Sequence, residues 1–464
     1  MKKKLFLLLI VLFLTTGVLP GCAREHGLDP DNPVTLALWH NYGGQMQKTM
    51  DALVDEFNNT VGKEKGVVLN VTSISSSASL HEKLTMAASG DPGAPALPDI
   101  TTCYPKTALT LAGKDKLVNL DSQFTGKELA AYLPRFIEEG RLEDKDGGLY
   151  VFPIAKSTEV LFVNQTLFDR FSQATGVTVA CFDTPEGIAD AAVKYRDWTD
   201  SQTPDTPGDG KAFYTSDAPF NYAQIGMAQQ GEGLIEKESL NLDNAAFKKI
   251  WDSYYAPSVK GGFAIFDGYS SDLSKTGEII CSTGSTAGIL FYGDTITYPD
   301  SRTENVEYTV LPYPVFENGQ KIAMQRGSGM AVTSSTPERE YAAGLFLKWF
   351  TAPEQNIQFV SSTGYLPVTE AAFGTAMNEE METVTNPNVK KLLAAAMTMQ
   401  QDYDFYIPPT FGTFDEMGSD FEADLKRVAT DARARYLEGL KTMTPEAAYA
   451  QATAGDYEAF VSGR

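Results

Sequence analysis

The sequence has few cysteines and histidines, which are the usual ligands of zinc. Its 464 residues include four cysteines and three histidines. The histidines, His26, His40 and His81, are scattered along the chain, and no two cysteines have the spacing of zinc ligands. The glycine pair at residues 327–329 precedes a predicted strand instead of a helix, so it does not indicate a dinucleotide-binding loop. We therefore expect neither a metal site nor another cofactor.

Basic residues are also scarce. Lys and Arg number 38 against 60 Asp and Glu, which gives a formal net charge of −22. A chain this acidic repels phosphate backbones and anionic headgroups, so no nucleic acid is expected as a partner. An anionic small ligand would need a local group of cations to bind.

The sequence has no apolar run long enough to span a membrane as a mature helix. Residues 1–21 join a basic head to an apolar run at residues 5–14, which is typical of a secretory signal peptide, and an uncleaved anchor is the less favoured alternative. Leu19-Pro20-Gly21-Cys22 resembles a bacterial lipobox. The resemblance implies that Cys22 is lipidated and becomes the new N-terminus, with residues 22–33 as a flexible tether.

The cysteines that follow Cys22 are odd in number. In an exported protein this leaves at least one thiol unpaired. We interpret all three as buried small apolar residues, namely Cys103, Cys181 and Cys281.

Short apolar runs and helical periodicity alternate after the tether. Strands are predicted at residues 34–39, 67–74 and 99–104, and helices at residues 46–57 and 80–88. This order predicts an α/β fold with parallel βαβ units. Ligands of such sheets bind at the carboxyl ends of the strands, where Trp39, His40 and Tyr104 are expected. Further helices are predicted at residues 184–198, 247–255 and 415–440, and another starts at Thr336.

Residues 148–164 predict a crossing between two parts of the molecule. Two strand-like apolar runs, residues 149–155 and 160–163, flank the polar insert of residues 156–159. A strand that stops at a proline, passes a few polar residues and resumes can leave one sheet and enter another. Its polar residues then lie where two lobes meet, and clefts between lobes are preferred places for small-molecule sites.

Several segments in the same order resemble the extracellular solute-binding proteins of ABC importers, in the group of the maltose-binding and glycerol-3-phosphate-binding proteins. The similar segments are Trp39-His40, Pro153-Ile154-Ala155, the strand and hydroxyl-rich turn at residues 276–285, the strand at residues 306–314, the crossing at residues 326–332, and Gly364-Tyr365-Leu366-Pro367. The resemblance covers nearly all of the mature chain.

The resemblance implies a type II periplasmic-binding-protein fold, with two lobes that are each a mostly parallel sheet flanked by helices, joined by a multi-strand hinge. The implied N-terminal lobe comprises residues 33–155 and 305–330, and the C-terminal lobe comprises residues 156–304 and 331–464. The resemblance also implies a monomeric receptor without catalytic residues. Such a receptor binds a sugar-like solute, docks on the permease subunits of the importer, and is held by its lipid on the outer face of the bacterial cytoplasmic membrane, in the periplasm or at the cell surface.

Aromatic rings near strand ends and turns are the first group of ligand-binding candidates, because such rings stack on the apolar face of a sugar. The candidates are Trp39, Tyr104, Tyr222 and Tyr365, with His40 beside the first. Packing in the core is the competing interpretation. It is preferred for Tyr222 and weighs equally for Tyr104, whereas the motifs around Trp39 and Tyr365 favour the cleft.

Short hydrogen-bonding residues at the crossings and turns form the second group, with ordinary turn chemistry as the alternative. They are Ser157, Thr158, Thr283, Ser285 and Ser328. Gly327 would allow a ligand to approach the backbone closely. The resemblance implies ligand contacts near Ser157, Ser285 and Gly327.

Two cations lie at the predicted crossings, and the chain departs from the glycerol-3-phosphate group elsewhere. Lys156 and Arg326 are candidates for an anionic ligand, or they pair with nearby acids. Pro105 replaces an acid of that group, His81 or Leu80 stands in place of an aromatic residue, and residues 408–414 lack its arginine.

These departures favour a carbohydrate, particularly an oligosaccharide, as the ligand. A glycerol phosphate or phosphodiester is the alternative. A secreted glycan-active enzyme is less favoured because no motif singles out a carboxylate pair or a nucleophile triad.

Overall fold

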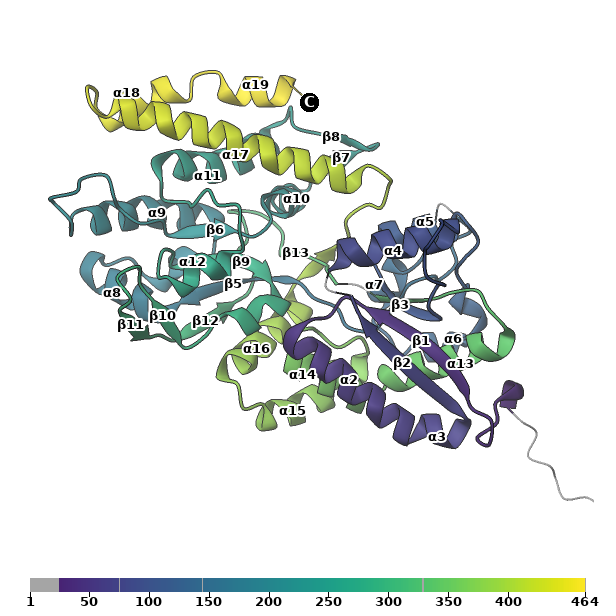
Figure 1. Ribbon diagram of the computed structural model, residues 1–464. Helices are drawn as coiled ribbons and strands as arrows, with labels where there is room; N and C mark the ends of the chain where they lie inside the picture. The colour runs from purple at the N-terminus through teal and green to yellow at the C-terminus, as the bar shows by residue number, and fades with distance from the viewer. Residues whose placement is uncertain (1–24, 75, 144, 328, 464) are drawn as a thin grey trace, which may run out of the picture.

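The computed structural model describes residues 25–74, 76–143, 145–327 and 329–463. Figure 1 shows two lobes connected by several segments of the chain. The predicted signal peptide, the predicted lipidation site Cys22 and Ser328 lie outside the described residues. Within these ranges every helix is too short or too polar to cross a bilayer, and no group of three or more His, Cys, Asp or Glu residues is arranged to hold a metal ion.

The first lobe is built on a sheet with the strand order β2-β1-β3-β14-β4. Its strands are β1 (Val34–His40), β2 (Val67–Ser73), β3 (Ile100–Cys103), β4 (Phe152–Pro153) and β14 (Gly329–Val332). β1 is parallel to β2 and β3, whereas β14 is antiparallel to β3 and β4. The side chains of β1 alternate between the core and partly exposed positions, which is the period of a strand.

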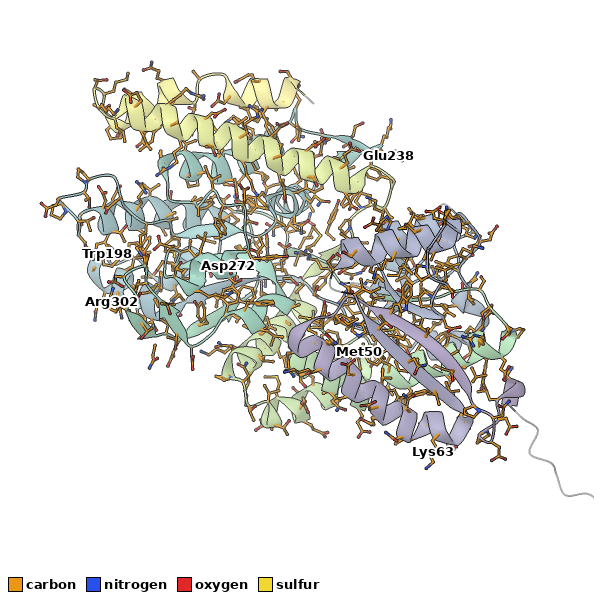
Figure 2. The ribbon with its side chains drawn as sticks, in the orientation of Figure 1. Met50, Lys63, Trp198, Glu238, Asp272 and Arg302 are labelled. Atoms are coloured by element: carbon orange, nitrogen blue, oxygen red, sulfur yellow. The ribbon has the colours of Figure 1, made fainter. Side chains whose placement is uncertain are left out.

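Helices cover both faces of this sheet. They are α2 (Gly44–Asn59), α3 (Val61–Lys65), α4 (Ser77–Ser89), α5 (Pro105–Ala112), α6 (Gly126–Leu129), α7 (Pro134–Glu139) and α13 (Pro337–Phe350). α2 buries Met50, Leu53 and Phe57 at helical spacing. Figure 2 shows Met50 on the inner side of α2, whereas Lys63 points outward from α3. α4 and α5 pack together on the other face, where Leu84 of α4 and Leu111 of α5 belong to one apolar cluster.

The second lobe is built on a sheet with the order β12-β5-β9-β6. Its strands are β5 (Glu159–Asn164), β6 (Tyr214–Ser216), β9 (Cys281–Ser285) and β12 (Tyr308–Leu311). β5 is antiparallel to β12 and β9, and β6 is parallel to β9. Every residue of β5 is buried, so this strand is the centre of the lobe.

The helices of the second lobe include the long α17, which lies along α11 in Figure 1. They are α8 (Gln165–Thr175), α9 (Pro185–Asp200), α10 (Pro219–Gln229), α11 (Ala245–Lys260), α12 (Ser270–Lys275), α17 (Phe414–Gly439), α18 (Pro445–Ala452) and α19 (Asp456–Ser462). Beside the connection lie α14 (Pro353–Thr363), α15 (Met377–Thr383) and α16 (Pro387–Asp402).

Short strand pairs and single helical turns complete the described chain. The strand pairs are β7 (Ile235–Glu236) with β8 (Ser239–Leu240), β10 (Thr295–Thr297) with β11 (Thr303–Asn305), and β13 (Ile322–Met324) with β15 (Asp404–Tyr406). Turns of 3-10 helix are Glu25–Gly27, Leu120–Ser122, Val179–Phe182 and Thr286–Phe291, and Ala372–Ala376 forms a π-helical turn.

The two-lobe α/β fold expected from the sequence is confirmed, with two corrections. First, both sheets are mixed instead of mostly parallel. β3 ends at the cleft between the two lobes, which is described below. β14 begins at this cleft and runs away from it, so the two neighbouring strands must be antiparallel. Second, β12 belongs to the sheet of the second lobe and β14 to that of the first, although the expected boundaries placed residues 305–330 in the first lobe and residues from 331 onward in the second. The chain therefore returns to the first lobe between β12 and β14.

Three chain segments meet where the lobes join. The backbone of Ser157 exchanges hydrogen bonds with that of Arg326, at N–O distances of 2.9 and 2.8 Å. The backbone of Lys156 exchanges hydrogen bonds with that of Leu366, at 3.0 and 2.6 Å. The polar insert of the first crossing is thus held between the other two segments by main-chain hydrogen bonds.

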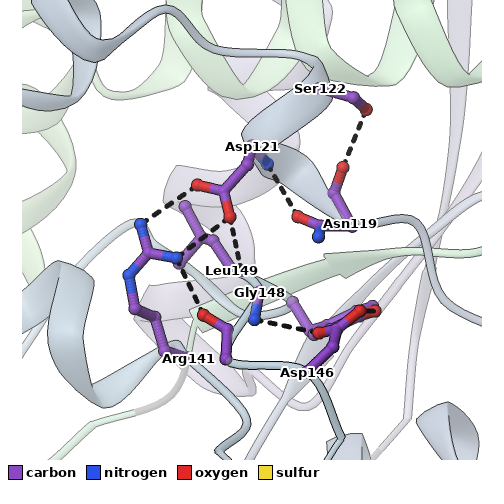
Figure 3. Close-up of polar contacts among 9 residues, drawn as sticks. Asn119, Asp121, Ser122, Arg141, Asp146, Gly148 and Leu149 are labelled. Atoms are coloured by element: carbon purple, nitrogen blue, oxygen red, sulfur yellow. Dashed lines mark hydrogen bonds and ion pairs between the residues drawn. The ribbon is translucent and has the colours of Figure 1, made fainter.

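A local polar network fixes the chain just before the first crossing (Figure 3). The Arg141 guanidinium donates two hydrogen bonds to the Asp121 carboxylate, at 2.9 and 3.0 Å, and one to the Gly147 carbonyl, at 3.0 Å. The backbone N–H of Leu149 donates to Asp121 at 3.2 Å. The bidentate Arg–carboxylate pair is only partly buried. We therefore interpret its role as geometric, because it sets the direction in which residues 149–155 enter the crossing.

Candidate functional site

A cleft of 530 Å³ lies between the lobes. The first lobe contributes residues of α4, the start of α5 and the end of α7. The second lobe contributes α10 and the start of α17. The connecting segments at residues 324–327 and 407–411 form the remaining wall. This volume is within the range of about 300–1,000 Å³ that is usual for small-molecule pockets.

Tyr104 is placed in the cleft by the geometry of β3 and α5. It follows the carboxyl end of β3 and is the residue before the first turn of α5, where Pro105 occupies the first helical position. The Tyr104 side chain remains 37% exposed, which is high for an aromatic residue in a protein of this size. The ring is therefore available to a ligand.

A second wall of the cleft is apolar. Ile407, Pro408 and Pro409 lead into Phe411 and Phe414, and all five line the cavity. The rings of Phe411 and Phe414 meet edge to face, with centroids 5.6 Å apart. Rings held in this way offer a preformed surface on which the apolar face of a ring-shaped ligand can stack.

The floor of the cleft holds a buried carboxylate between two donors. Glu159, at the start of β5, is 1% exposed, and its Oε1 accepts hydrogen bonds from Asn221 Nδ2 at 2.6 Å and from Arg326 Nη1 at 2.8 Å. Both donors line the cavity. Burial raises the pKa of Glu159, and the charge of Arg326 opposes this rise.

A second buried ion pair lies beside this floor. Lys156 Nζ is 2.9 Å from Glu139 Oε1, and the two side chains are 4% and 10% exposed. Gln325 donates a hydrogen bond to the same carboxylate and another to the Arg135 carbonyl, at 3.2 Å. Glu139 and Gln325 line the cleft. The pair thus ties α7 of the first lobe to the crossing segments.

The mouth of the cleft is bridged by an exposed ion pair. Lys106 on α5 and Asp415 on α17 approach to 2.8 Å, which joins the two lobes. His81 Nδ1 lies 2.9 Å from Thr107 Oγ1 beside this pair. The pKa of His81 is lowered, first by burial and then by the nearby Lys106. We therefore expect a neutral imidazole at pH 7.

Three of the ligand-binding candidates named from the sequence line the cleft, namely Tyr104, Arg326 and Gly327. Gly327 has a φ of 101°, and a Cβ there would lie 3.1 Å from the Ala155 carbonyl oxygen. This glycine is therefore required where two crossing segments approach each other, independently of any ligand. Ser328, named with it, is outside the described residues.

The other candidates at the first crossing are buried behind the cleft wall. Lys156, Ser157 and Thr158 are 3%, 4% and 0% exposed. Lys156 acts as a partner of an acid, which is the alternative to anion binding that the sequence left open. Ser157 takes part in the main-chain pairing of the crossing.

Candidates on the first lobe also lie outside the cleft lining. His40 is fully buried, its Nδ1 accepts from the Tyr42 N–H at 3.1 Å, and burial lowers its pKa. Trp39 packs against the apolar cluster under α4 and α5. Tyr365 packs against Tyr42 and Phe359, and burial raises its pKa.

Candidates on the second lobe are held by internal hydrogen bonds. The Tyr222 hydroxyl lies 2.9 Å from Ser253 Oγ, as expected for a core residue. The Thr283 hydroxyl lies 2.6 Å from that of Tyr214. Ser285 caps a turn of 3-10 helix by accepting a hydrogen bond from the Ala287 N–H, so turn chemistry explains its position.

The sequence analysis missed most of the cleft floor. Glu159 stands in the polar insert that predicted the crossing, and a search for the partner of Arg326 would have considered it. No sequence motif around Glu139 or Asn221 predicts a place in the cleft, because only the tertiary fold brings α7 and α10 to it. Phe411 and Phe414 belong to a segment that was noted only for its missing arginine.

Solved structures with the same fold are similar to nearly all of the chain. The cyclic alpha-maltosyl-1,6-maltose binding protein of Arthrobacter globiformis has a TM-score of 0.67 at 17% identity, covering 93% of this chain and 100% of the other. The ABC substrate-binding protein Lmo0181 of Listeria monocytogenes, in complex with cycloalternan, has a TM-score of 0.65 at 18% identity with the same coverage. UgpB of Mycobacterium tuberculosis, in complex with glycerophosphocholine, has a TM-score of 0.64 at 17% identity, covering 93% and 99%.

A comparison with curated proteins found no match. A protein family, described as bacterial extracellular solute-binding protein, matches residues 52–390, which is more than half of the chain. The match spans most of the first lobe, the first crossing and most of the second lobe, and it agrees with the shared two-lobe fold. The chain therefore belongs to the bacterial extracellular solute-binding protein family, whose members bind their solutes without transforming them.

Proposed function

We propose that this protein is the substrate-binding lipoprotein of an ABC importer, and that it captures a neutral carbohydrate, particularly an oligosaccharide, in the interlobe cleft. The protein acts as a monomer, anchored through Cys22 outside the cytoplasmic membrane, and delivers its solute to the permease subunits. The observation that carries the choice of a neutral solute is the pairing of the cations around the cleft.

Each cation at the cleft floor or mouth already has a carboxylate partner. Arg326 is paired with Glu159 and Lys106 with Asp415. Lys156, just behind the floor, is paired with Glu139. An anionic ligand would meet cations whose charge is already offset by a carboxylate, whereas a neutral ligand needs no free cation.

The cleft offers both kinds of contact that a sugar needs. Tyr104 on one side and Phe411 and Phe414 on the other present aromatic surface. Asn221 and Thr107 are polar residues that line the same space. Because these groups come from both lobes, a bound saccharide gains contacts when the lobes close, and binding therefore favours the closed state.

A glycerol phosphate or phosphodiester is the second candidate. The observation in its favour is that the Arg326 side chain remains 36% exposed within the cleft, so it retains donors for an anion. The fold shared with the glycerophosphocholine-bound UgpB is compatible with this alternative.

The test is a thermal-shift screen of residues 23–464, which omit the signal peptide and Cys22. The panel contains maltotriose, cycloalternan, glycerol 3-phosphate and glycerophosphocholine. A ligand at about 100 times its dissociation constant adds about 2.7 kcal/mol to the free energy of unfolding, which such a screen detects. A neutral saccharide hit that is recovered chemically unchanged supports the proposal. Hits confined to the two phosphate compounds would replace the saccharide by the second candidate.

A further inference from the structure

Arg326 is held rigidly at the cleft floor. Its backbone N–H and carbonyl both pair with Ser157, so the position of its Cα is set by the crossing and not by a free loop. Its Nη1 lies 2.8 Å from Glu159 Oε1, and its side chain remains 36% exposed at the cleft that it lines. The pair therefore combines a cation that a ligand can reach with an anion that a ligand cannot reach.

Glu159 is positioned as rigidly as its partner. It begins β5, where its backbone is in register with Ser285 of β9, and its side chain is 1% exposed. Within the described residues its Oε2 has no hydrogen-bond partner, so the carboxylate charge is offset through Oε1 by Arg326 and Asn221.

Other titratable groups near the pair do not duplicate the role of Glu159. The negative charge of Asp217 contributes to the raised pKa of Glu159. The charge of Glu159 in turn contributes to the raised pKa of Tyr313, which lies in the segment after β12. The charge of Arg326 also acts to lower the pKa of Glu422 on α17, but the Oε1 of Glu422 accepts a hydrogen bond from the Phe220 N–H at 3.0 Å. Glu159 is the group in direct contact with the guanidinium.

We propose that Glu159 determines the charge selectivity of the cleft. Its buried carboxylate offsets (masks) the positive charge of Arg326, so that the site accepts neutral solutes and disfavours anions. The inference rests on the proposed function and deepens it, because it assigns the preference for neutral ligands to one residue that does not itself touch the ligand. Glu159 is thus a positioning and charge-masking residue, and the contact residue is Arg326.

The test removes the charge of Glu159 and keeps its shape. Glu159→Gln retains an oxygen that can accept from Asn221 or Arg326, but it leaves the guanidinium charge unmasked. We expect the affinity for glycerol 3-phosphate and for inorganic phosphate to rise about tenfold at low ionic strength. Affinity for the neutral saccharide found in the screen should change much less, because that ligand does not depend on a net charge.

A matched control makes the same charge change away from the cleft. Glu304 pairs with Arg170 on the surface of the second lobe, so Glu304→Gln also frees an arginine and alters the net charge equally. We expect this variant to bind both probes as the unaltered protein does. A similar gain in phosphate affinity in Glu304→Gln would overturn the proposal, because global charge would then explain the effect.

A double variant separates masking from a structural role. Glu159→Gln with Arg326→Gln has no cation to unmask, and we expect the gain in phosphate affinity to disappear. Loss of both neutral and anionic binding in Glu159→Gln, or an unchanged ratio of the two affinities, would contradict the inference. If the unaltered protein binds phosphate compounds and no saccharide, the proposed function fails first, and this is visible before any variant is made.

Discussion

The buried pair of Lys156 and Glu139 leads to a prediction at the scale of single residues. Removal of one partner from a buried ion pair leaves the other charge uncompensated, so we expect Glu139→Ala to lower the free energy of unfolding by about 3–5 kcal/mol. The measurement is urea denaturation of the ligand-free protein, followed by circular dichroism.

The control for this prediction removes both charges. Lys156→Met combined with Glu139→Ala buries no unpaired ammonium, so the double variant should recover most of the lost stability. If the double variant is as unstable as Glu139→Ala, the loss comes from packing or from the hydrogen bond of Gln325 to Glu139, and the electrostatic explanation is wrong.

Single-residue roles were predictable from the sequence where local geometry decides them. Tyr222 lies in the core as preferred, and Cys103 and Cys281 are buried free thiols as expected, whereas Cys181 is only partly buried. The partners of the cations could not be predicted in the same way. Arg326 and its partner Glu159 are 167 residues apart in the chain, and only the tertiary fold selects that acid among the 60 acidic residues.

The second prediction concerns the start of a helix. The Thr184 side chain accepts a hydrogen bond from the Gly187 N–H at 2.9 Å and satisfies one of the unpaired donors of α9. We expect Thr184→Ala to cost about 1 kcal/mol of stability, measured by urea denaturation. Thr184→Ser keeps the hydroxyl and should cost less. Equal losses in the two variants would show that the methyl group, not the cap, is responsible.

Whole elements were predicted well where capping and periodicity agree. Thr184-Pro185 and Thr336-Pro337 marked the starts of α9 and α13 correctly. The apolar run of residues 149–155 was expected to be a strand but forms only the short β4. The N–H groups of Tyr150 and Val151 donate to the carbonyl of Gly140 at the end of α7, at 3.0 and 3.1 Å, so they are not free to pair with a neighbouring strand.

At the scale of the whole molecule, the sequence located the crossing but not the surfaces that meet across it. The cleft is completed by α7, α10 and the segment before α17, which are far apart in the chain. Neither hydrophobic periodicity nor a local motif predicts that segments so far apart in the chain come together. The family resemblance supplied the two lobes, whereas the composition of the cleft depends on side chains specific to this chain.

The ion pair between Lys106 and Asp415 leads to a prediction about the opening and closing of the two lobes. It connects α5 and α17 across the mouth of the cleft, so it stabilises the conformation in which the two helices are close. Both side chains are largely exposed, and such pairs contribute about 0.2–1 kcal/mol. We expect Asp415→Asn to shift the ligand-free protein toward more open conformations by up to about fivefold, and the shift should diminish at high salt because exposed charges are screened.

The distance between spin labels on the two lobes would report this shift. Lys63 on α3 and Glu238 in the turn between β7 and β8 are exposed and lie on different lobes in Figure 2, so cysteines introduced there can carry the labels in a Cys181→Ser background. Asp252→Asn is the control, because it breaks an exposed pair with Lys248 within α11 alone. A longer mean distance in Asp415→Asn and not in Asp252→Asn is expected. Identical distance distributions in the two variants would mean that the cleft floor, and not its mouth, sets the equilibrium between open and closed lobes.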